Sequence, residues 1–216
     1  MDMQQCGSVC SPVHVFSDRM VPEDVISAVV KAADAAPFPY PQPMRDVHLR
    51  KFFVFKTGTV PCTQLETILI HAIERSCEEL IAFFGWRAYT PEGPGSFIQL
   101  LQNFVQTGIS SFRTAPCIVL ITEERRFPPV EQESLAFAVS HLWMAAVSFG
   151  LGAHLVPGVS YLSRRSEFFQ LVHLPPGKYA VMGVALGYPH DDLERGAEDT
   201  GREPDVTWLY DRPGQT

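Results

Sequence analysis

Two cysteines near the N-terminus, Cys6 and Cys10, have the spacing most suggestive of metal chemistry in this 216-residue sequence. A zinc or iron–sulfur site needs further thiolates or imidazoles at suitable spacing. The remaining cysteines, Cys62, Cys77 and Cys117, are widely scattered, and an odd total of five is not a disulfide framework. We therefore expect no metal, reduced thiols in the N-terminal segment, and core positions for Cys77 and Cys117, which lie in apolar runs.

Other catalytic patterns are absent from the sequence. The seven histidines include no His-x-x-x-His pair of the kind that binds zinc, and His141 is expected to be a satisfied core residue. The sequence contains neither a Gly-x-Ser-x-Gly nucleophile elbow nor a phosphate-binding P-loop. Gly150-x-Gly152 follows a predicted helix, which is the wrong context for a dinucleotide-binding turn. Catalytic side chains are therefore left unassigned.

An uncharged stretch, residues 134–163, is the central feature of the chain, although 19% of all residues are charged. Its first half predicts a helix over residues 132–149 that is apolar on nearly every side, so it is surrounded by protein or by lipid. Ser140, His141 and Ser148 interrupt the apolar surface, and Gly150 ends the helix with a left-handed residue. These features favour a helix buried in protein, and we expect no membrane span.

The predicted helix is followed in order by Gly150-Leu151-Gly152, Pro157-Gly158, Leu174-Pro175 and a predicted strand from Lys178 that ends in Gly187-Tyr188-Pro189. This order resembles the nitroreductase-like flavoproteins, in which a central helix is followed by a short extended run and a Pro-Gly turn. The resemblance implies an α+β fold, in which a layered sheet carries helices on both faces around a central buried helix. It also implies an intertwined homodimer and a bound flavin mononucleotide (FMN).

In the family, the FMN phosphate is held by an N-terminal Arg-Ser-x-Arg motif just before a phenylalanine. The matching residues here run from Ser11 through Pro12 and His14 to Phe16, so that Ser11 and His14 replace both arginines. The resemblance thus places Ser11, Pro12 and His14 at the phosphate. Guanidinium groups make the strongest phosphate contacts, so FMN should be held more loosely than is usual in the family.

The remaining flavin contacts map onto three further places. The family's Pro-Ser-x-x-Asn-x-Gln-Pro-Trp loop matches residues 36–44, which are one residue shorter and lack the asparagine. Gln42 of this loop is the candidate for the pyrimidine edge of the flavin, and Tyr40 is a further cofactor-binding candidate. Backbone N–H groups around Pro157 and Gly158 would face the reactive N5 atom, although turn geometry explains that glycine equally well. Arg202 either completes the phosphate site or is a solvated arginine in an acidic tail.

Several predicted elements must position these residues. Helices are expected over residues 22–36, 63–84, 96–106, 132–149 and 163–172, and buried strands over residues 51–55, 115–121 and 179–186. Thr63 and Glu66 have the spacing of a capping box that would open the second helix. Four alternating prolines between residues 37 and 43 force an extended loop. Helices that alternate with apolar strands predict a layered α+β domain.

Chain length and composition bear on the domain organisation, the partners and the location that we expect. We expect one domain over residues 1–216, with an N-terminal arm over about residues 1–12 and a C-terminal arm over about residues 190–216. The resemblance implies that Trp208, Leu209 and Tyr210 anchor this arm on a partner subunit; the alternative is a tail on its own subunit. A net charge of −7 disfavours nucleic-acid binding, and without a secretory signal a cytoplasmic protein is expected.

Three functions are compatible with these residues. The resemblance implies an FMN-dependent oxidoreductase that takes hydride from NAD(P)H and reduces a small-molecule acceptor such as a nitroaromatic or a quinone. The missing arginines leave open a family member that binds FMN weakly or not at all and acts as a sequestering or regulatory module. A flavin-modifying enzyme that uses the same pocket is the third alternative.

Overall fold

The fold is built on a four-stranded antiparallel sheet in the order β1-β2-β4-β3. The computed structural model describes residues 12–39, 49–85, 87 and 94–190. The two central strands, β2 (Cys117–Glu124) and β4 (Tyr179–Gly187), are buried along almost their whole length. Their unbroken apolar sequences predicted this burial. The outer strands are β1 (Arg50–Lys56) and β3 (Gly152–Leu155).

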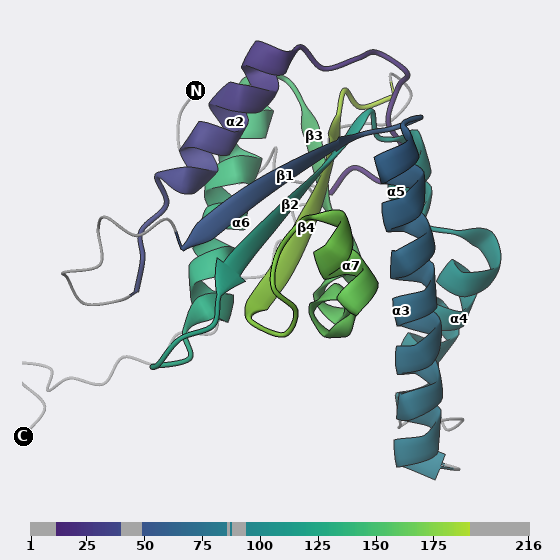
Figure 1. Ribbon diagram of the computed structural model, residues 1–216. Helices are drawn as coiled ribbons and strands as arrows, with labels where there is room; N and C mark the ends of the chain where they lie inside the picture. Colours follow the sequence, from purple (N-terminus) through teal and green to yellow (C-terminus); the bar gives the residue numbers. More distant parts are fainter. Residues whose placement is uncertain (1–11, 40–48, 86, 88–93, 191–216) are drawn as a thin grey trace, which may run out of the picture.

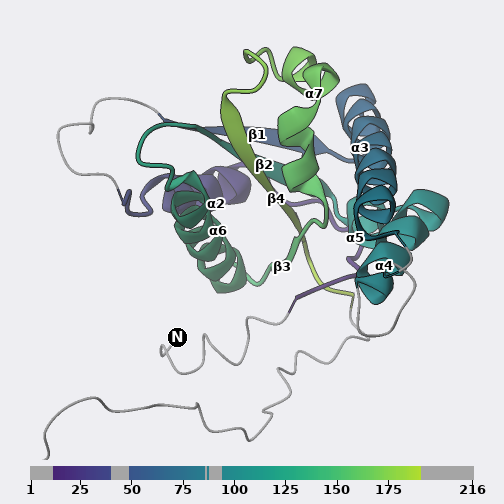
Figure 2. The same cartoon turned by 90° about the horizontal axis from the view of Figure 1, so that it is seen from below.

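Helices cover both faces of the sheet (Figures 1 and 2). On one face lie α2 (Glu23–Asp34) and α6 (Glu131–Ser148). On the other face are α3 (Val60–Phe84), α4 (Gly95–Thr107), α5 (Ser110–Thr114), the 3-10 helix η3 (Val159–Arg164) and α7 (Ser166–Leu171). Each face has its own apolar core. The predicted α+β architecture, a layered sheet with helices on both faces, is therefore confirmed.

A glycine at the end of α6 allows the chain to leave the helix and enter β3. Gly150 has a φ of +74°, a left-handed conformation that costs glycine little. Its N–H donates to Val147 O at 2.9 Å, while the N–H of Leu151 reaches back to Ala146 O at 2.9 Å. This pair of bonds is a Schellman motif. Because β3 begins at Gly152, the motif places β3 directly after the helix.

One local expectation was wrong, and two short helices were not predicted. The capping box does not form, because α3 begins at Val60, and the Thr63 hydroxyl donates to the carbonyl of Thr59 at 3.3 Å. Pro61, in the first turn, accounts for this earlier start, because proline fits where helix N–H groups lack partners. The short helix expected over residues 163–172 is present as α7, Ser166–Leu171. The preceding η3 and the five-residue α5 were not predicted.

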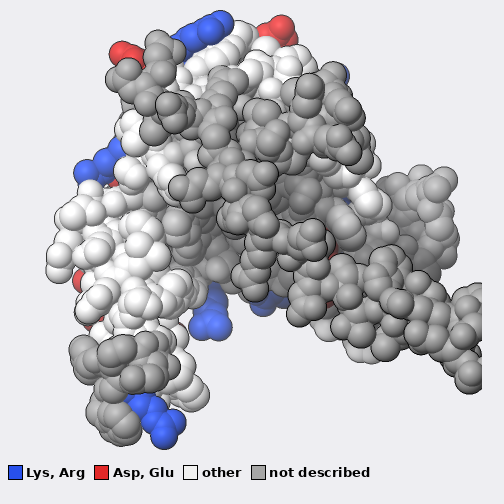
Figure 3. Space-filling model, turned by 180° about the vertical axis from the view of Figure 1, so that it is seen from behind, with Lys and Arg blue, Asp and Glu red and all other residues white. Residues whose placement is uncertain are grey.

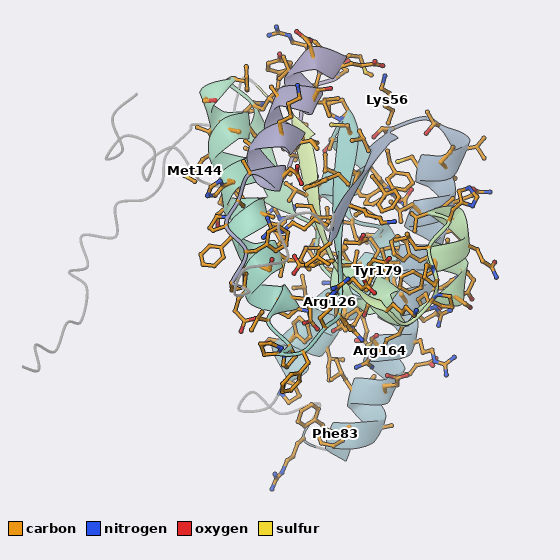
Figure 4. The ribbon with its side chains drawn as sticks, turned by 60° about the vertical axis from the view of Figure 1, so that its left-hand side comes forward. Lys56, Phe83, Arg126, Met144, Arg164 and Tyr179 are labelled. Carbon is orange, nitrogen blue, oxygen red and sulfur yellow. The ribbon has the colours of Figure 1, made fainter. Side chains whose placement is uncertain are left out.

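One side of α6 packs inside the chain, and the other side is open. Leu135 and Leu142 are fully buried between the sheet and α2, whereas Phe137 and Met144 are 47% and 42% exposed. Met144 points away from the sheet (Figure 4). Seen from behind, the described surface atoms are mostly uncharged (Figure 3).

Among the described residues, none of the helices has the length and apolar character needed to cross a membrane.

Candidate functional site

The N-terminal segment, residues 12–16, lies beside β3, which leads to the Pro157–Gly158 turn. The N–H of Val13 donates to Ala153 O at 3.0 Å, and Phe16 forms an antiparallel bridge with Pro189. The side chain of Val13 also fills the space that a Cβ on Gly152 would occupy. The segment matched to the phosphate motif therefore follows the outer edge of β3. Sequence spacing gave no indication of this pairing, because the two segments are about 140 residues apart.

His14 contacts a histidine that the sequence did not single out. The rings of His14 and His154 lie with their centroids 4.3 Å apart, nearly edge to face. His14 is exposed, whereas His154 on β3 is partly buried, and its Nδ1 has no hydrogen-bond partner among the described residues. Burial, aided by the nearby His14, lowers the pKa of His154 to about 4. His154 is therefore neutral at physiological pH.

The depressed pKa of His154 predicts acid sensitivity. Because the unfolded chain takes up this proton near pH 6.5 and the folded chain only near pH 4, stability is lost as pH falls between these values. After allowance for solvent screening, we expect the free energy of unfolding to fall by about 1 kcal/mol between pH 7.5 and pH 5. Urea titrations at pH 7.5 and 5 would measure it. The variant His154→Gln should reduce the loss, whereas His71→Gln, at an exposed site on α3, should not; equal losses in all three proteins would contradict this assignment.

The Pro157–Gly158 turn follows β3 and is closely packed. Gly158 has a φ of +74°, and a Cβ built on it would lie 2.7 Å from Cγ1 of Ile73 in α3. The N–H of Val156 donates to Gly183 O at 2.9 Å, which extends the pairing with β4 up to the turn. Both the backbone conformation and the packing therefore require glycine. The turn presents backbone groups at a fixed position rather than a reactive side chain.

The structure describes one region of the predicted site. His14 contacts His154 on β3, and β3 leads into the turn at Gly158, four positions after His154 in the chain. Pro12 is exposed beside this region, and the other candidates, Ser11, Tyr40, Gln42 and Arg202, lie outside the described residues.

The described cysteines supply no nucleophile. Cys62, Cys77 and Cys117 are buried free thiols, which confirms the core positions expected for the last two. Burial raises the pKa of all three thiols, and that of Cys117 reaches about 12. The thiolate is the reactive form, so these groups are inert at neutral pH. The part of the chain that the structure describes holds no cluster of three metal-ligating side chains; Cys6 and Cys10 lie outside it.

A groove of about 800 Å³ lies elsewhere, along the outer edge of β1. The exposed side chain of Val54 contributes to it, and the Lys56–Glu23 ion pair lies at its border (Lys56 is labelled in Figure 4). Two strands, β2 and β4, separate β1 from β3 in the sheet. The groove is therefore distinct from the region around His14 and Gly158.

Known structures share this fold. A nitroreductase with bound FMN from Bacteroides fragilis superposes with a TM-score of 0.62 at 14% identity, covering 100% of this chain and 97% of that chain. Iodotyrosine deiodinase bound to FMN and 3-iodo-L-tyrosine gives 0.64 at 18% identity, covering 98% and 100%. An FMN- and NADPH-dependent nitroreductase from Sphigopyxis sp. strain HMH gives 0.63 at 14% identity, covering 99% and 100%.

Sequence comparison identifies the family directly. No curated protein sequence matches this chain significantly. The sequence model of the nitroreductase family, however, matches residues 13–188, which include His14, all four strands and the Pro157–Gly158 turn. This match covers well over half of the 216 residues. The chain therefore belongs to the nitroreductase family of oxidoreductase enzymes.

Proposed function

We propose that this protein is an FMN-dependent NAD(P)H oxidoreductase that reduces a small acceptor such as a nitroaromatic or a quinone. The observation that carries the proposal is the course of the N-terminal segment beside β3, the strand that leads into the Pro157–Gly158 turn. When bound, FMN accepts and donates the hydride, so the protein need only bind, orient and shield it. No catalytic side chain is required for this chemistry.

In this proposal the FMN phosphate lies near the N-terminal segment and the ring lies near the Pro157–Gly158 turn. Ser11, Pro12 and His14 would hold the phosphate, with Arg202 as a further cation. Gly158 and Pro157 would place backbone groups against the ring, in a turn that packs against α3. Gln42 would bond the pyrimidine edge, and Tyr40 is a further cofactor-binding candidate in the same loop. An imidazole offers a phosphate weaker contacts than a guanidinium, so the fit predicts modest FMN affinity.

That weak phosphate site also supports a second candidate, a family member that sequesters small molecules without a stable flavin. His154, whose ring contacts that of His14, remains neutral at physiological pH and adds no charge for a phosphate. The similarity of the fold to iodotyrosine deiodinase supports a third candidate. This candidate is an enzyme that uses the same pocket for another flavin reaction.

The absorbance spectrum of the purified protein, followed by an NAD(P)H oxidation assay, tests the proposal. We expect flavin absorbance after FMN is added and the excess is removed, and oxidation of NADH or NADPH that depends on a nitroaromatic or quinone acceptor. Protein that remains colourless at saturating FMN would favour the second candidate. A flavin-loaded protein that oxidises neither nucleotide would favour the third.

The variant His14→Arg should tighten FMN by about tenfold and leave riboflavin, which lacks the phosphate, unchanged. Fluorescence titration of both flavins with the parent, His14→Arg and His14→Ala would measure these effects. Equal FMN affinities in all three proteins would place His14 away from the phosphate.

We also propose an intertwined homodimer formed by a single domain over residues 1–216, with the arm over residues 190–216 crossing to the partner. The exposed apolar side of α6 supports it, because burying each large side chain is worth roughly 1.5–3 kcal/mol. We expect dimeric mass by light scattering and a shift toward monomer in Phe137→Glu. The control Val60→Glu, at an exposed apolar position on α3, should stay dimeric. A monomeric parent would refute the dimer.

A cytoplasmic location is part of the same proposal. Cys62, Cys77 and Cys117 are free thiols, which are usual where the environment is reducing. NAD(P)H, the proposed electron donor, would be available there.

A further inference from the structure

The backbone of the segment that carries His14 is held on both sides of this residue. On one side, the N–H of Val13 donates to Ala153 O on β3 at 3.0 Å. On the other side, the N–H of Phe16 donates to Oγ1 of Thr114 at 3.3 Å, and the Phe16 side chain is buried in the apolar core that faces α3. Because the backbone is fixed, the orientation of the exposed His14 side chain depends on what that side chain contacts.

His14 lies against the ring of His154 on β3. The two ring centroids are 4.3 Å apart and the ring planes meet at 61°, close to the edge-to-face arrangement that aromatic side chains favour. His154 is itself held by the sheet, because β3 pairs with β4 and places His154 opposite Ala185. A side chain that is partly buried on a paired strand therefore supports one that is exposed.

His154 offers His14 a ring surface rather than a charge. Burial lowers the pKa of His154 to about 4, and the nearby His14 adds to this shift, so the imidazole is neutral at physiological pH. A neutral ring cannot act as a second cation for a phosphate group. Its Nδ1 is buried and has no hydrogen-bond partner among the described residues, so a ring carbon at this position would break no bond there. Phenylalanine is therefore a conservative replacement for His154.

We propose that His154 is a positioning residue that orients the His14 imidazole toward a phosphate group and thereby favours FMN over riboflavin. The second half of this inference rests on the proposed function, because it takes His14 to be a ligand of the FMN phosphate. His154 itself would not bind the flavin. It acts by fixing the His14 side chain before the ligand arrives, which lowers the entropic cost of binding. The effect is therefore confined to a flavin that carries a phosphate.

NMR spectroscopy of the flavin-free protein tests the first half. In the parent, we expect nuclear Overhauser contacts between the ring protons of His14 and His154, because their centroids are only 4.3 Å apart. The His14 ring shifts should move to random-coil values in His154→Ala and remain displaced in His154→Phe. The ring shifts of His71, which is exposed on α3, serve as the internal control and should not change. A parent without the ring contacts, or His14 shifts that do not respond to His154→Ala, would overturn the positioning role.

Titration with FMN and riboflavin tests the second half. His154→Ala should lower the preference for FMN over riboflavin by about threefold or more, the effect expected when one side chain must be immobilised on binding. His154→Phe keeps the ring contact and should retain the preference of the parent. In a His14→Ala background, adding His154→Ala should have no further effect, because His154 acts through His14. Equal losses for both flavins, a loss that phenylalanine does not restore, or additive losses in the double variant would overturn this role.

Two controls separate this inference from a general loss of stability and from the proposed function. Val172→Ala, a cavity variant beside the groove at β1, should lower stability and leave the ratio of the two flavin affinities unchanged. A change of that ratio in Val172→Ala would overturn the specific role of His154. A parent protein that binds neither flavin would refute the proposed function and with it the second half, whereas the NMR experiment would still decide whether His154 orients His14.

Discussion

Replacing Glu123 with alanine should lower the free energy of unfolding by about 3–5 kcal/mol, because it leaves the guanidinium of Arg50 buried without its counter-charge. The same change removes the acceptor of the Ser134 hydroxyl. Urea or thermal denaturation of the purified variant would measure the loss. Such a loss is a large fraction of the total stability of a typical domain, so we also expect a lower yield of folded protein.

Two further variants distinguish the loss of the buried Arg50–Glu123 ion pair from the general effect of losing a carboxylate. Glu79→Ala removes an exposed partner of Arg75, at 3.5 Å, and should cost at most about 1 kcal/mol. The variant Glu123→Gln, which keeps an oxygen acceptor for Arg50 and for the Ser134 hydroxyl, should cost less than Glu123→Ala. If Glu123→Ala and Glu79→Ala destabilise equally, the buried pair contributes no more than a surface pair.

Substitution of Gly158 by alanine should cost about 2–5 kcal/mol and weaken flavin binding. A left-handed backbone costs a non-glycine residue about 1–2 kcal/mol, and a poorly accommodated methyl group about 1–3 kcal/mol more. The new Cβ would lie 2.7 Å from Cγ1 of Ile73, so either α3 or the turn must move. Denaturation and FMN titration on the same preparation would measure the two effects.

Gly177 provides the matched control for this variant. Its φ is +78°, close to that of Gly158, but a Cβ built there would meet nothing within 4 Å. Gly177→Ala should therefore cost only the backbone strain, about 1–2 kcal/mol, and leave flavin affinity unchanged. A Gly158→Ala variant that matches Gly177→Ala in stability and binds FMN like the parent would show that the turn does not contact the flavin.

The sequence determined the parts of this protein that depend on local chemistry. The apolar run that became β2 could be recognised as buried because a strand covered on both faces needs no alternation. The end of α6 was predictable because Gly150 alone supplies a left-handed residue there. The same logic failed at Thr63, where Pro61 in the preceding turn allowed the helix to start earlier.

The tertiary structure decided which distant residues meet. The contact between His14 and His154 depends on the N-terminal segment following the edge of β3, and no spacing in the sequence encodes that pairing. Arg50 was not identified from the sequence. Its place in the core depends on hydrogen-bond acceptors that β2, α2 and α6 contribute. Local propensity acts over one or two turns of chain, whereas buried charges and site geometry arise from packing between elements far apart in sequence.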